Sequence, residues 1–303
     1  MALKYWAVIL ILGIGWGMSF ALNAVLLREL GPVTISFLRV ALGALGCWAW
    51  VLLARRPVRL SVRRAAALTG FGVLSYAGPF AFYALGQQHV ASGVAGIVNA
   101  TTPAFTVAVA QFWPGGERAT LHKVAGVACG LCGIVLLSLP VLGQGSGSEA
   151  WAILLILCAP VCYGFSMNIA RSFGDLQPVE MAAVALTGAA AAMAPLSLWL
   201  EGVPAATRPE TWAALAMIGF VLTSAAFIAL YWVLPKVGPA NISIPTMVAP
   251  VSAILLGTWL LEEALQPAHL AGLAAILSGL VLMDGRLFRF GRKTGALQNQ
   301  PDG

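Results

Sequence analysis

Charge is the scarcest feature of this sequence. Only 9% of its 303 residues are Asp, Glu, Lys or Arg, against about 25% in a typical soluble domain. Hydrophobic residues make up 60%, and the mean hydropathy is +0.89. A soluble monomer could not cover so much apolar surface, and an ordinary water-soluble enzyme is therefore excluded. The composition predicts a polytopic membrane protein, because about 20 apolar residues cross the bilayer core as one helix.

Motifs for catalysis and ATP use are also lacking. The three histidines, His89, His122 and His269, are scattered, and no HExxH zinc site or Ser-His-Asp set can be assembled from them. No glycine-rich loop ending in Lys-Ser/Thr is present to hold ATP phosphates. Cys129 and Cys132 form a CxxC pair without a nearby His or acid, which favours packing over metal binding. We therefore expect no enzyme, no ATP-driven pump, no metal, no cofactor and no nucleic-acid partner.

Apolar segments of helical length follow one another along the whole chain. We expect ten of them, at residues 5–27, 32–54, 66–88, 91–113, 122–140, 150–171, 179–200, 212–234, 239–261 and 268–285. Turn signals or charges separate them, as in the basic run from Arg55 to Arg64. The expected fold is an all-α membrane protein with ten transmembrane helices.

The basic residues are distributed unevenly between the two sides of these segments. Of the 17 Lys and Arg residues, fourteen fall on the side of the N-terminus, two (Arg28 and Arg208) on the other side, and Arg39 inside the second segment. Loops rich in Lys and Arg stay in the cytoplasm. We therefore expect both termini to be cytoplasmic and the protein to lie in the plasma membrane, the inner membrane of a bacterium.

The chain also repeats itself. Three residues of the first half recur 146 positions later: Glu117 as Glu263, Gly126 as Gly272 and Gly133 as Gly279. Each half holds five expected segments, and an odd number means that the second half enters the membrane from the opposite side. We expect two inverted five-helix repeats, at 1–143 and 148–287, followed by a basic cytoplasmic tail at 288–303. Inverted repeats are common in secondary transporters, whose substrate site lies between the halves.

Spaced motifs in both halves resemble a known family. They are Trp-Gly-Met-Ser-Phe at 16–20, Pro32, Phe-Leu-Arg at 37–39, Pro103 and Gly-Glu-Arg-Ala-Thr at 116–120 in the first half, with Pro250, Leu-Glu-Glu at 261–263, Gly272 and Gly279 in the second. This pattern is similar to the EamA half-repeat of the drug/metabolite transporter superfamily. The resemblance implies a secondary transporter of small metabolites, a family that includes exporters of amino acids, among them aromatic ones.

Ionisable residues inside the segments would mark a translocation path, because charge is costly in hydrocarbon. All eleven acidic residues fall in loops or at segment ends, and this favours facilitated diffusion, exchange, or coupling through a group at a cavity mouth. Glu117 and Glu263 are expected to cap helices or brace loops. Arg39 has two readings: it attracts a substrate carboxylate, or it snorkels or binds carbonyls at a helix end. Its aligned position in the second half is Ala185, which is not basic.

Polar and aromatic side chains form stripes at helical spacing, which face either a cavity or neighbouring helices. The stripes comprise Trp16, Ser19 and Asn23 in the first segment, Tyr76, Pro79, Phe80 and Tyr83 in the third, Tyr163 and Ser166 in the sixth, and Thr223, Phe227 and Tyr231 in the eighth. Helix-break signals occur in the fourth and ninth segments, at Asn99, Thr102 and Pro103 and at Asn241, Pro245 and Pro250. Paired breaks in both halves point to a binding site, although a packing kink is the simpler alternative. Together with Arg39, these residues are the candidate substrate-binding set.

The sequence is therefore interpreted as a monomeric secondary carrier that exports amino acids, possibly aromatic, by alternating access around a central cavity. Its expected partners are a small-molecule substrate and the lipid bilayer. An importer or exchanger of another metabolite or drug is the first alternative. A membrane-embedded enzyme, or a scaffold or channel subunit, is a weaker one, since no catalytic cluster and no ring of pore charges is present.

Overall fold

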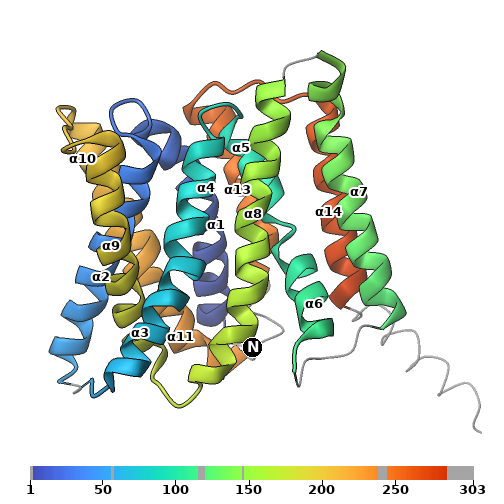
Figure 1. Cartoon of the computed structure of the whole chain (residues 1–303). Helices are drawn as coiled ribbons and strands as arrows, with labels where there is room; N and C mark the ends of the chain where they lie inside the picture. Colours follow the sequence, from blue (N-terminus) through green and yellow to red (C-terminus); the bar gives the residue numbers. More distant parts are fainter. Residues whose placement is uncertain (1–2, 56–57, 115–119, 145–146, 238–243, 285–303) are drawn as a thin grey trace, which may run out of the picture.

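The structure is a computed structural model that describes residues 3–55, 58–114, 120–144, 147–237 and 244–284. These residues form ten helical segments joined by short connections, without a strand (Figure 1). The elements are α1 (Leu3–Leu26), α2 (Pro32–Leu53), α3 (Val62–Gly72), η1 (Val73–Ala77), α4 (Gly78–Gly86), α5 (Ser92–Asn99), α6 (Thr102–Phe112), α7 (Leu121–Gln144), α8 (Gly147–Ile169), η2 (Ala170–Phe173), α9 (Pro178–Glu201), α10 (Pro209–Ala216), η3 (Met217–Ala225), α11 (Ala226–Val237), α13 (Ile244–Leu260) and α14 (Pro267–Asp284). Where the structure describes them, the expected segments are confirmed to within a few residues at each end.

Most of these segments are long and apolar enough to cross a membrane. Seven have at least 18 residues with high hydropathy, and three shorter apolar stretches lie within α7, α13 and α14. Many large apolar side chains, such as Leu53, Trp199 and Trp259, are about four-fifths exposed on the outside of the bundle. An exposed apolar belt of this kind fits a lipid environment and would be costly in water.

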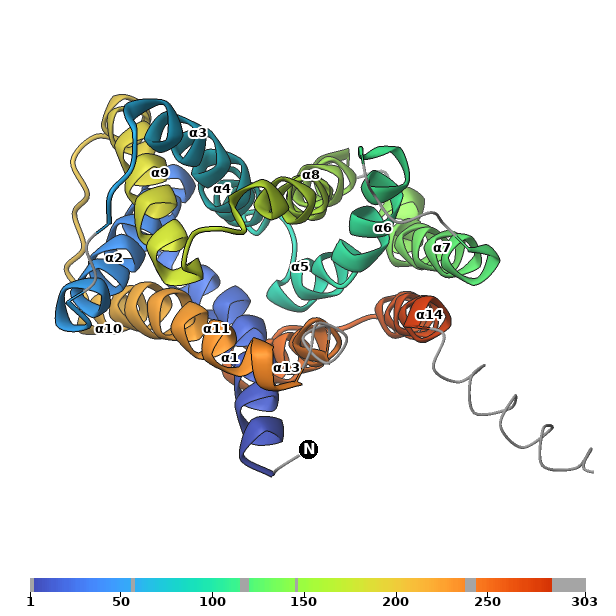
Figure 2. The same ribbon diagram turned by 90° about the horizontal axis from the view of Figure 1, so that it is seen from below.

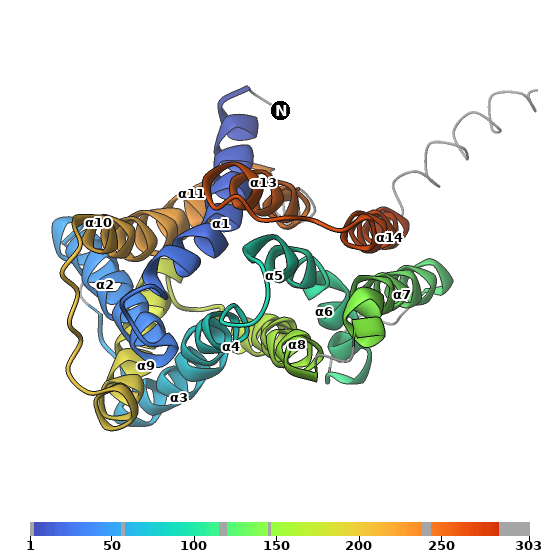
Figure 3. The ribbon, with the colours of Figure 1, turned by 90° about the horizontal axis from the view of Figure 1, so that it is seen from above.

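Helices of the two halves pack in a matched pattern. Three helices of the first half each pack against the helix at the same place in the second half: α2 against α9, α5 against α13 and α7 against α14. The remaining contacts also come in corresponding pairs, since α1 packs against α13 as α8 packs against α6. The views from both ends show α7 and α14 together at one edge of the bundle and α2 and α9 together in the opposite part (Figures 2 and 3).

Glycines of the repeat form close backbone contacts between α7 and α14. A Cβ atom at Gly133 would lie 2.8 Å from the carbonyl oxygen of Gly272, and a Cβ atom at Gly279 would lie 2.5 Å from that of Gly126. In the repeat, Gly126 corresponds to Gly272 and Gly133 to Gly279. The contact of Gly133 with Gly272 is therefore the counterpart of the contact of Gly279 with Gly126. Such reciprocal contacts are the signature of a two-fold relation. Because only glycine lets two helix backbones approach this closely, these residues account for the α7–α14 pairing.

Two spans contain wide π-helical turns at corresponding places. The η1 segment precedes Pro79, whose missing N–H and bulky ring disfavour an ordinary α-helical bond to the carbonyl of Ser75. In η3, the hydroxyl of Thr223 donates to the carbonyl of Ile218, five residues earlier. π-turns shift the register of a helix and occur often at functional sites. The stripe pattern of the sequence did not reveal either turn.

The expected helix breaks are confirmed in one span and only partly described in the other. The fourth span is interrupted at Ala100 and Thr101, between α5 and α6, with Pro103 in the first turn of α6. In the ninth span, Asn241 lies outside the described residues, and α13 is continuous through Pro250. A break at Pro250 was therefore a wrong expectation. The helix stays continuous because it is packed tightly between α1 and α5, where a Cβ atom at Gly17 would lie 1.8 Å from Ser252 Oγ.

Three glutamates join the halves at one end of the bundle, which we call the carboxylate end (Glu29, Glu201 and Glu263). Each accepts hydrogen bonds from the N-terminus of a helix in the other half: Glu29 from the start of α10, Glu201 from the start of α2 and Glu263 from the start of α5. Carboxylates are favourable there because the first N–H groups of a helix have no partner within it. The capping role expected for Glu263 is confirmed, whereas Glu117 lies outside the described residues.

Candidate functional site

Arg39 is the centre of a buried polar cluster inside the bundle. It lies on α2 and is only 6% exposed. Its Nε donates to Thr223 Oγ1 at 3.3 Å and its Nη2 to Ser19 Oγ at 3.2 Å. The guanidinium carbon lies 3.8 Å above the ring of Phe80, a cation–π contact. Arg39 therefore points into the protein, and the snorkelling alternative is wrong.

No carboxylate neutralises this arginine among the residues that the structure describes. The ion pairs found there are Arg64 with Asp175 and Arg208 with Glu29, and both lie near helix ends. A buried guanidinium held only by neutral groups is costly, and the cluster is therefore suited to bind an anionic group.

Aromatic rings from two further elements extend this cluster. Tyr76 of η1 packs against Phe227 of α11 with ring centroids 5.3 Å apart and against Phe80 at 6.4 Å. Tyr76 and Phe80 are buried, and Phe227 is half-buried. Rings at these distances stabilise one another and also form an apolar wall beside the charged group. Three of the expected stripes thus supply groups to the cluster: Ser19 from the first, Tyr76 and Phe80 from the third, and Thr223 with Phe227 from the eighth.

A second group of polar contacts links α4 to the break between α5 and α6. Tyr83 donates its hydroxyl proton to Asn99 Oδ1 at 2.7 Å, and Thr102 Oγ1 donates to the carbonyl oxygen of Asn99 at the same distance. Tyr83 also packs edge-to-face on Phe20, with centroids 5.1 Å apart. The interrupted helix is thus held to α4 by side chains. At the break, the carbonyl oxygen of Asn99 accepts a hydrogen bond from Thr102 Oγ1, as a backbone group freed inside a membrane requires.

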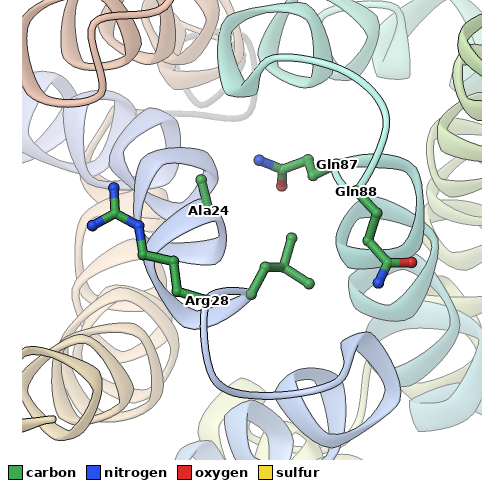
Figure 4. Close-up of a pocket in the computed structure, with 5 residues that line it drawn as sticks. Ala24, Arg28, Gln87 and Gln88 are labelled. Atoms are coloured by element: carbon green, nitrogen blue, oxygen red, sulfur yellow. The ribbon is translucent and has the colours of Figure 1, made fainter.

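A third group leads from the carboxylate end toward Arg39. Asn23 Nδ2 donates to Gln87 Oε1 at 3.1 Å, and Gln87 Nε2 donates to the carbonyl oxygen of Phe20 at 2.8 Å. Gln87 also lines a pocket of about 360 Å³ together with Ala24, Leu27, Arg28 and Gln88. Figure 4 shows the side chain of Gln87 extending toward Ala24, while Arg28 points to the opposite side. The pocket at this end therefore reaches Gln87, the hydrogen-bond partner of Asn23.

Several candidate residues are not connected to the cluster by any hydrogen bond or ring contact that the described part of the chain provides. Trp16 is half-buried on α1, Ser166 donates to the carbonyl of Cys162 within its own helix, and Pro245 and Pro250 are buried on α13. The side chain of Tyr231 and all of Asn241 lie outside the described residues. The described contacts therefore bring together only part of the candidate set, in the groups around Arg39, Tyr83 and Asn23.

Sequence reasoning missed Gln87. The pair Gln87-Gln88 follows the apolar third span directly, and two amides at the end of a span were the available signal. The role of Arg39 could not be decided from sequence, because its depth of seven residues beyond Pro32 allows both an inward and an interfacial position. No group of three or more potential metal ligands occurs in the part of the chain that the structure describes.

Known proteins resemble this chain along most of its length. The profile of the EamA-like transporter family matches twice, at residues 4–139 and 150–283. The uncharacterized transporter YoaV of Bacillus subtilis is 24% identical over 281 residues, which are 92% of this chain and 94% of that protein. A probable terminal-alkyne amino-acid exporter of Streptantibioticus cattleyicolor is 26% identical over 290 residues, 93% of each chain. A solved crystal structure with 21% sequence identity superposes with a TM-score of 0.67 and covers 92% of this chain and 97% of its own, which establishes a shared fold.

Proposed function

Because this chain belongs to the EamA-like transporter family, and is thus a multi-pass membrane transporter rather than an enzyme, we propose that it exports amino acids and that Arg39 binds their carboxylate group. The name of the Streptantibioticus relative as an amino-acid exporter agrees with this substrate class. The aromatic wall of Tyr76, Phe80 and Phe227 would suit an apolar or aromatic side chain of the substrate.

The observation that carries the proposal is the environment of Arg39. Its guanidinium is buried, its hydrogen-bond partners are the neutral hydroxyls of Ser19 and Thr223, and no acid neutralises it among the described residues. An arginine presents several N–H donors in a plane, and a carboxylate can accept two of them at once. A substrate carboxylate would therefore remove the cost of the unneutralised charge, and this cost favours anionic over neutral solutes.

The proposal includes an inverted architecture. We place five helices in each half (1–143 and 148–287), ten transmembrane helices in total, and a basic cytoplasmic tail at 288–303. The reciprocal contacts Gly133–Gly272 and Gly126–Gly279 support a two-fold axis between the halves. The excess of Lys and Arg on the side of the N-terminus supports two cytoplasmic termini in a plasma or bacterial inner membrane, with the carboxylate end outside. Movement between two such halves would give alternating access in a monomer.

Transport into proteoliposomes tests the proposal. Purified protein is reconstituted, and uptake of labelled amino acids is compared with uptake of the corresponding amino-acid amides. The intact protein should transport the acids in preference to the amides. Arg39→Gln should reduce uptake of the acids at least tenfold, because a hydrogen bond to a charged group contributes about 1.5–3 kcal/mol and about 1.4 kcal/mol is tenfold.

The matched control is Arg59→Gln, which removes an exposed arginine outside the bundle core. It should leave uptake unchanged. Equal loss of acid and amide transport in Arg39→Gln, at equal protein level and melting temperature, would assign Arg39 a purely structural role. Preference of the intact protein for amides would contradict carboxylate recognition. Transport of labelled solute only in the direction that corresponds to entry into the cell would favour an importer.

A further inference from the structure

One buried polar atom beside the Arg39 cluster has no hydrogen-bond partner. Asn23 is 2% exposed, and its Oδ1 accepts no bond among the described residues. The orientation of its amide is set by its neighbour. Gln87 donates its Nε2 to the carbonyl of Phe20 and thereby turns Oε1 toward Asn23, which must donate its own Nδ2. The Asn23 acceptor is therefore directed away from Gln87 and left free. A buried acceptor without a donor is unfavourable and requires an explanation.

The residues of α1 and α4 that contact Arg39 indicate where Asn23 lies relative to it. Asn23 lies one turn beyond Ser19 on the same face of α1, and Ser19 is hydrogen-bonded to Arg39. On α4, Phe80 touches Arg39, and Gln87 lies about two turns further toward the carboxylate end. The pair Asn23–Gln87 thus forms a layer next to the Arg39 layer. The spacing along α1 is about 6 Å, four residues at a rise of about 1.5 Å each.

This spacing matches the charged head of an α-amino acid. The ammonium nitrogen and the carboxylate are bonded to the same carbon, and each needs about 2.9 Å to its hydrogen-bond partner. A carboxylate on the guanidinium therefore brings the ammonium group within reach of an acceptor one helical turn away. Resting on the function proposed above, we propose that Asn23 Oδ1 accepts a hydrogen bond from the α-ammonium group of the substrate. The two layers then recognise the zwitterion as a unit.

Selectivity for the amine follows from this arrangement. A carboxylic acid without the amino group would satisfy Arg39 but leave Asn23 Oδ1 unpaired. Sites built to hydrogen-bond one group of a substrate reject the analogue that lacks it, because their own polar atom then stays buried without a partner. The protein should therefore bind an amino acid at least tenfold more tightly than its desamino analogue.

Equilibrium binding to the full chain in lipid nanodiscs tests this inference. The probes are three pairs of an amino acid and its desamino acid: L-phenylalanine with 3-phenylpropanoate, L-leucine with 4-methylpentanoate, and L-threonine with 3-hydroxybutanoate. Each pair is measured on the intact protein, on Asn23→Leu and on Arg39→Gln. Asn168→Leu is the matched control, because Asn168 is also 2% exposed with an unpartnered Oδ1, but its amide bonds within its own helix, to the carbonyl of Gly164.

We expect the intact protein and Asn168→Leu to prefer the amino acid of at least one pair tenfold or more. Asn23→Leu should lose this preference while it still binds the desamino acid, and Arg39→Gln should weaken both members of the pair. Equal binding of both members by the intact protein would overturn the role of Asn23 and leave carboxylate binding by Arg39 intact. Should Arg39→Gln bind both as tightly as the intact protein, the function proposed above would fail. If Asn23→Leu does not fold, equal binding of both members of every pair by the intact protein still overturns the inference.

Discussion

At Arg39, two hydroxyl groups and an aromatic ring take the place that a carboxylate holds in most buried ion pairs. The hydroxyl of Thr223 accepts from Arg39 while it donates its proton to the carbonyl of Ile218. This fixed donor direction leaves the oxygen lone pairs for the guanidinium. The position of the Thr223 hydroxyl beside Arg39 therefore depends on its hydrogen bond to the backbone of η3.

Replacement of Thr223 by valine removes this acceptor and changes the shape of the side chain very little. The unfolding free energy should fall by about 1–3 kcal/mol, because a buried donor of Arg39 loses its partner. The apparent half-saturation for amino-acid transport should rise severalfold, since the guanidinium is no longer held in place. Thermal unfolding in detergent and uptake kinetics measure the two effects. A variant with lower stability but the same half-saturation would show that Thr223 does not orient Arg39.

Glu29 makes stability depend on pH at the carboxylate end. Hydrogen bonds from the hydroxyls of Thr207 and Thr211, followed by backbone N–H groups of the α10 start, lower its pKa from 4.5 to about 2. Ionised Glu29 thus contributes stability that is fully present above pH 4.5 and is lost as the pH falls from 4.5 toward 2. Glu29→Gln should lower the melting temperature at pH 7 and flatten its decline below pH 4.5. Parallel melting curves of the variant and the intact protein across this range would contradict the assignment.

Among the elements, the third span shows how a proline changes the course of a helix. Pro79 follows η1, and the rings on both sides of this wide turn, Tyr76 and Phe80, reach the cluster. Pro79→Ala restores a backbone N–H and permits a regular α-helix. The register between Tyr76 and Phe80 would then shift, so transport should fall severalfold at an unchanged or higher melting temperature. Full transport by a stable Pro79→Ala variant would show that the π-turn has no role in the site.

The start of α2 depends on a carboxylate from the other half. Glu201 accepts from the backbone N–H groups of Val33 at 3.0 Å and Thr34 at 2.7 Å. Loss of a helix cap costs about 0.5–2 kcal/mol, and Glu201→Ala should destabilise the protein by this amount in denaturant unfolding. Glu210→Ala is the control, because this exposed acid lies in the first turn of α10 and accepts no hydrogen bond among the described residues. Equal effects of both variants would contradict the cap.

The helical elements were predictable because hydropathy and length alone define a span, whereas the contacts of single side chains were not. The continuous helix at Pro250 depends on packing against Gly17 and Gly96, which are distant in sequence. The π-turns depend on hydroxyl and proline effects that the stripe periodicity does not report. Gln87 lies at a span end, where sequence reasoning expects solvent, yet it bonds to Asn23 inside the bundle.

At the scale of the whole molecule, the repeat is symmetric in packing but not in chemistry. The position that corresponds to Arg39 is Ala185, which is fully buried and lies where α9 meets Gly72 of α3. The buried cationic side chain is thus present in one half only. The contacts between α7 and α14 follow the two-fold relation. The polar cluster around Arg39 does not, because Ala185 stands at the corresponding position. A substrate site offset toward the first half is consistent with this difference.

The inverted arrangement proposed above predicts the side of each loop. Reporter fusions at residues 60 and 300 should both report the cytoplasm, because the basic loops lie there in our topology. A fusion at residue 204, between α9 and α10, should report the opposite side. Signals from opposite sides at 60 and 300 would contradict the number of spans and the inversion together.

Counterflow in proteoliposomes is the most direct test of a carrier that moves amino acids through a site at Arg39. Vesicles are loaded with an excess of an unlabelled amino acid, and the labelled amino acid is added outside at low concentration. A carrier that exposes one Arg39 site alternately to each side must accumulate label transiently above its equilibrium level, and Arg39→Gln must abolish this overshoot. Label that only equilibrates without an overshoot would contradict carrier transport, and an overshoot of equal size in Arg39→Gln would contradict a substrate site at Arg39.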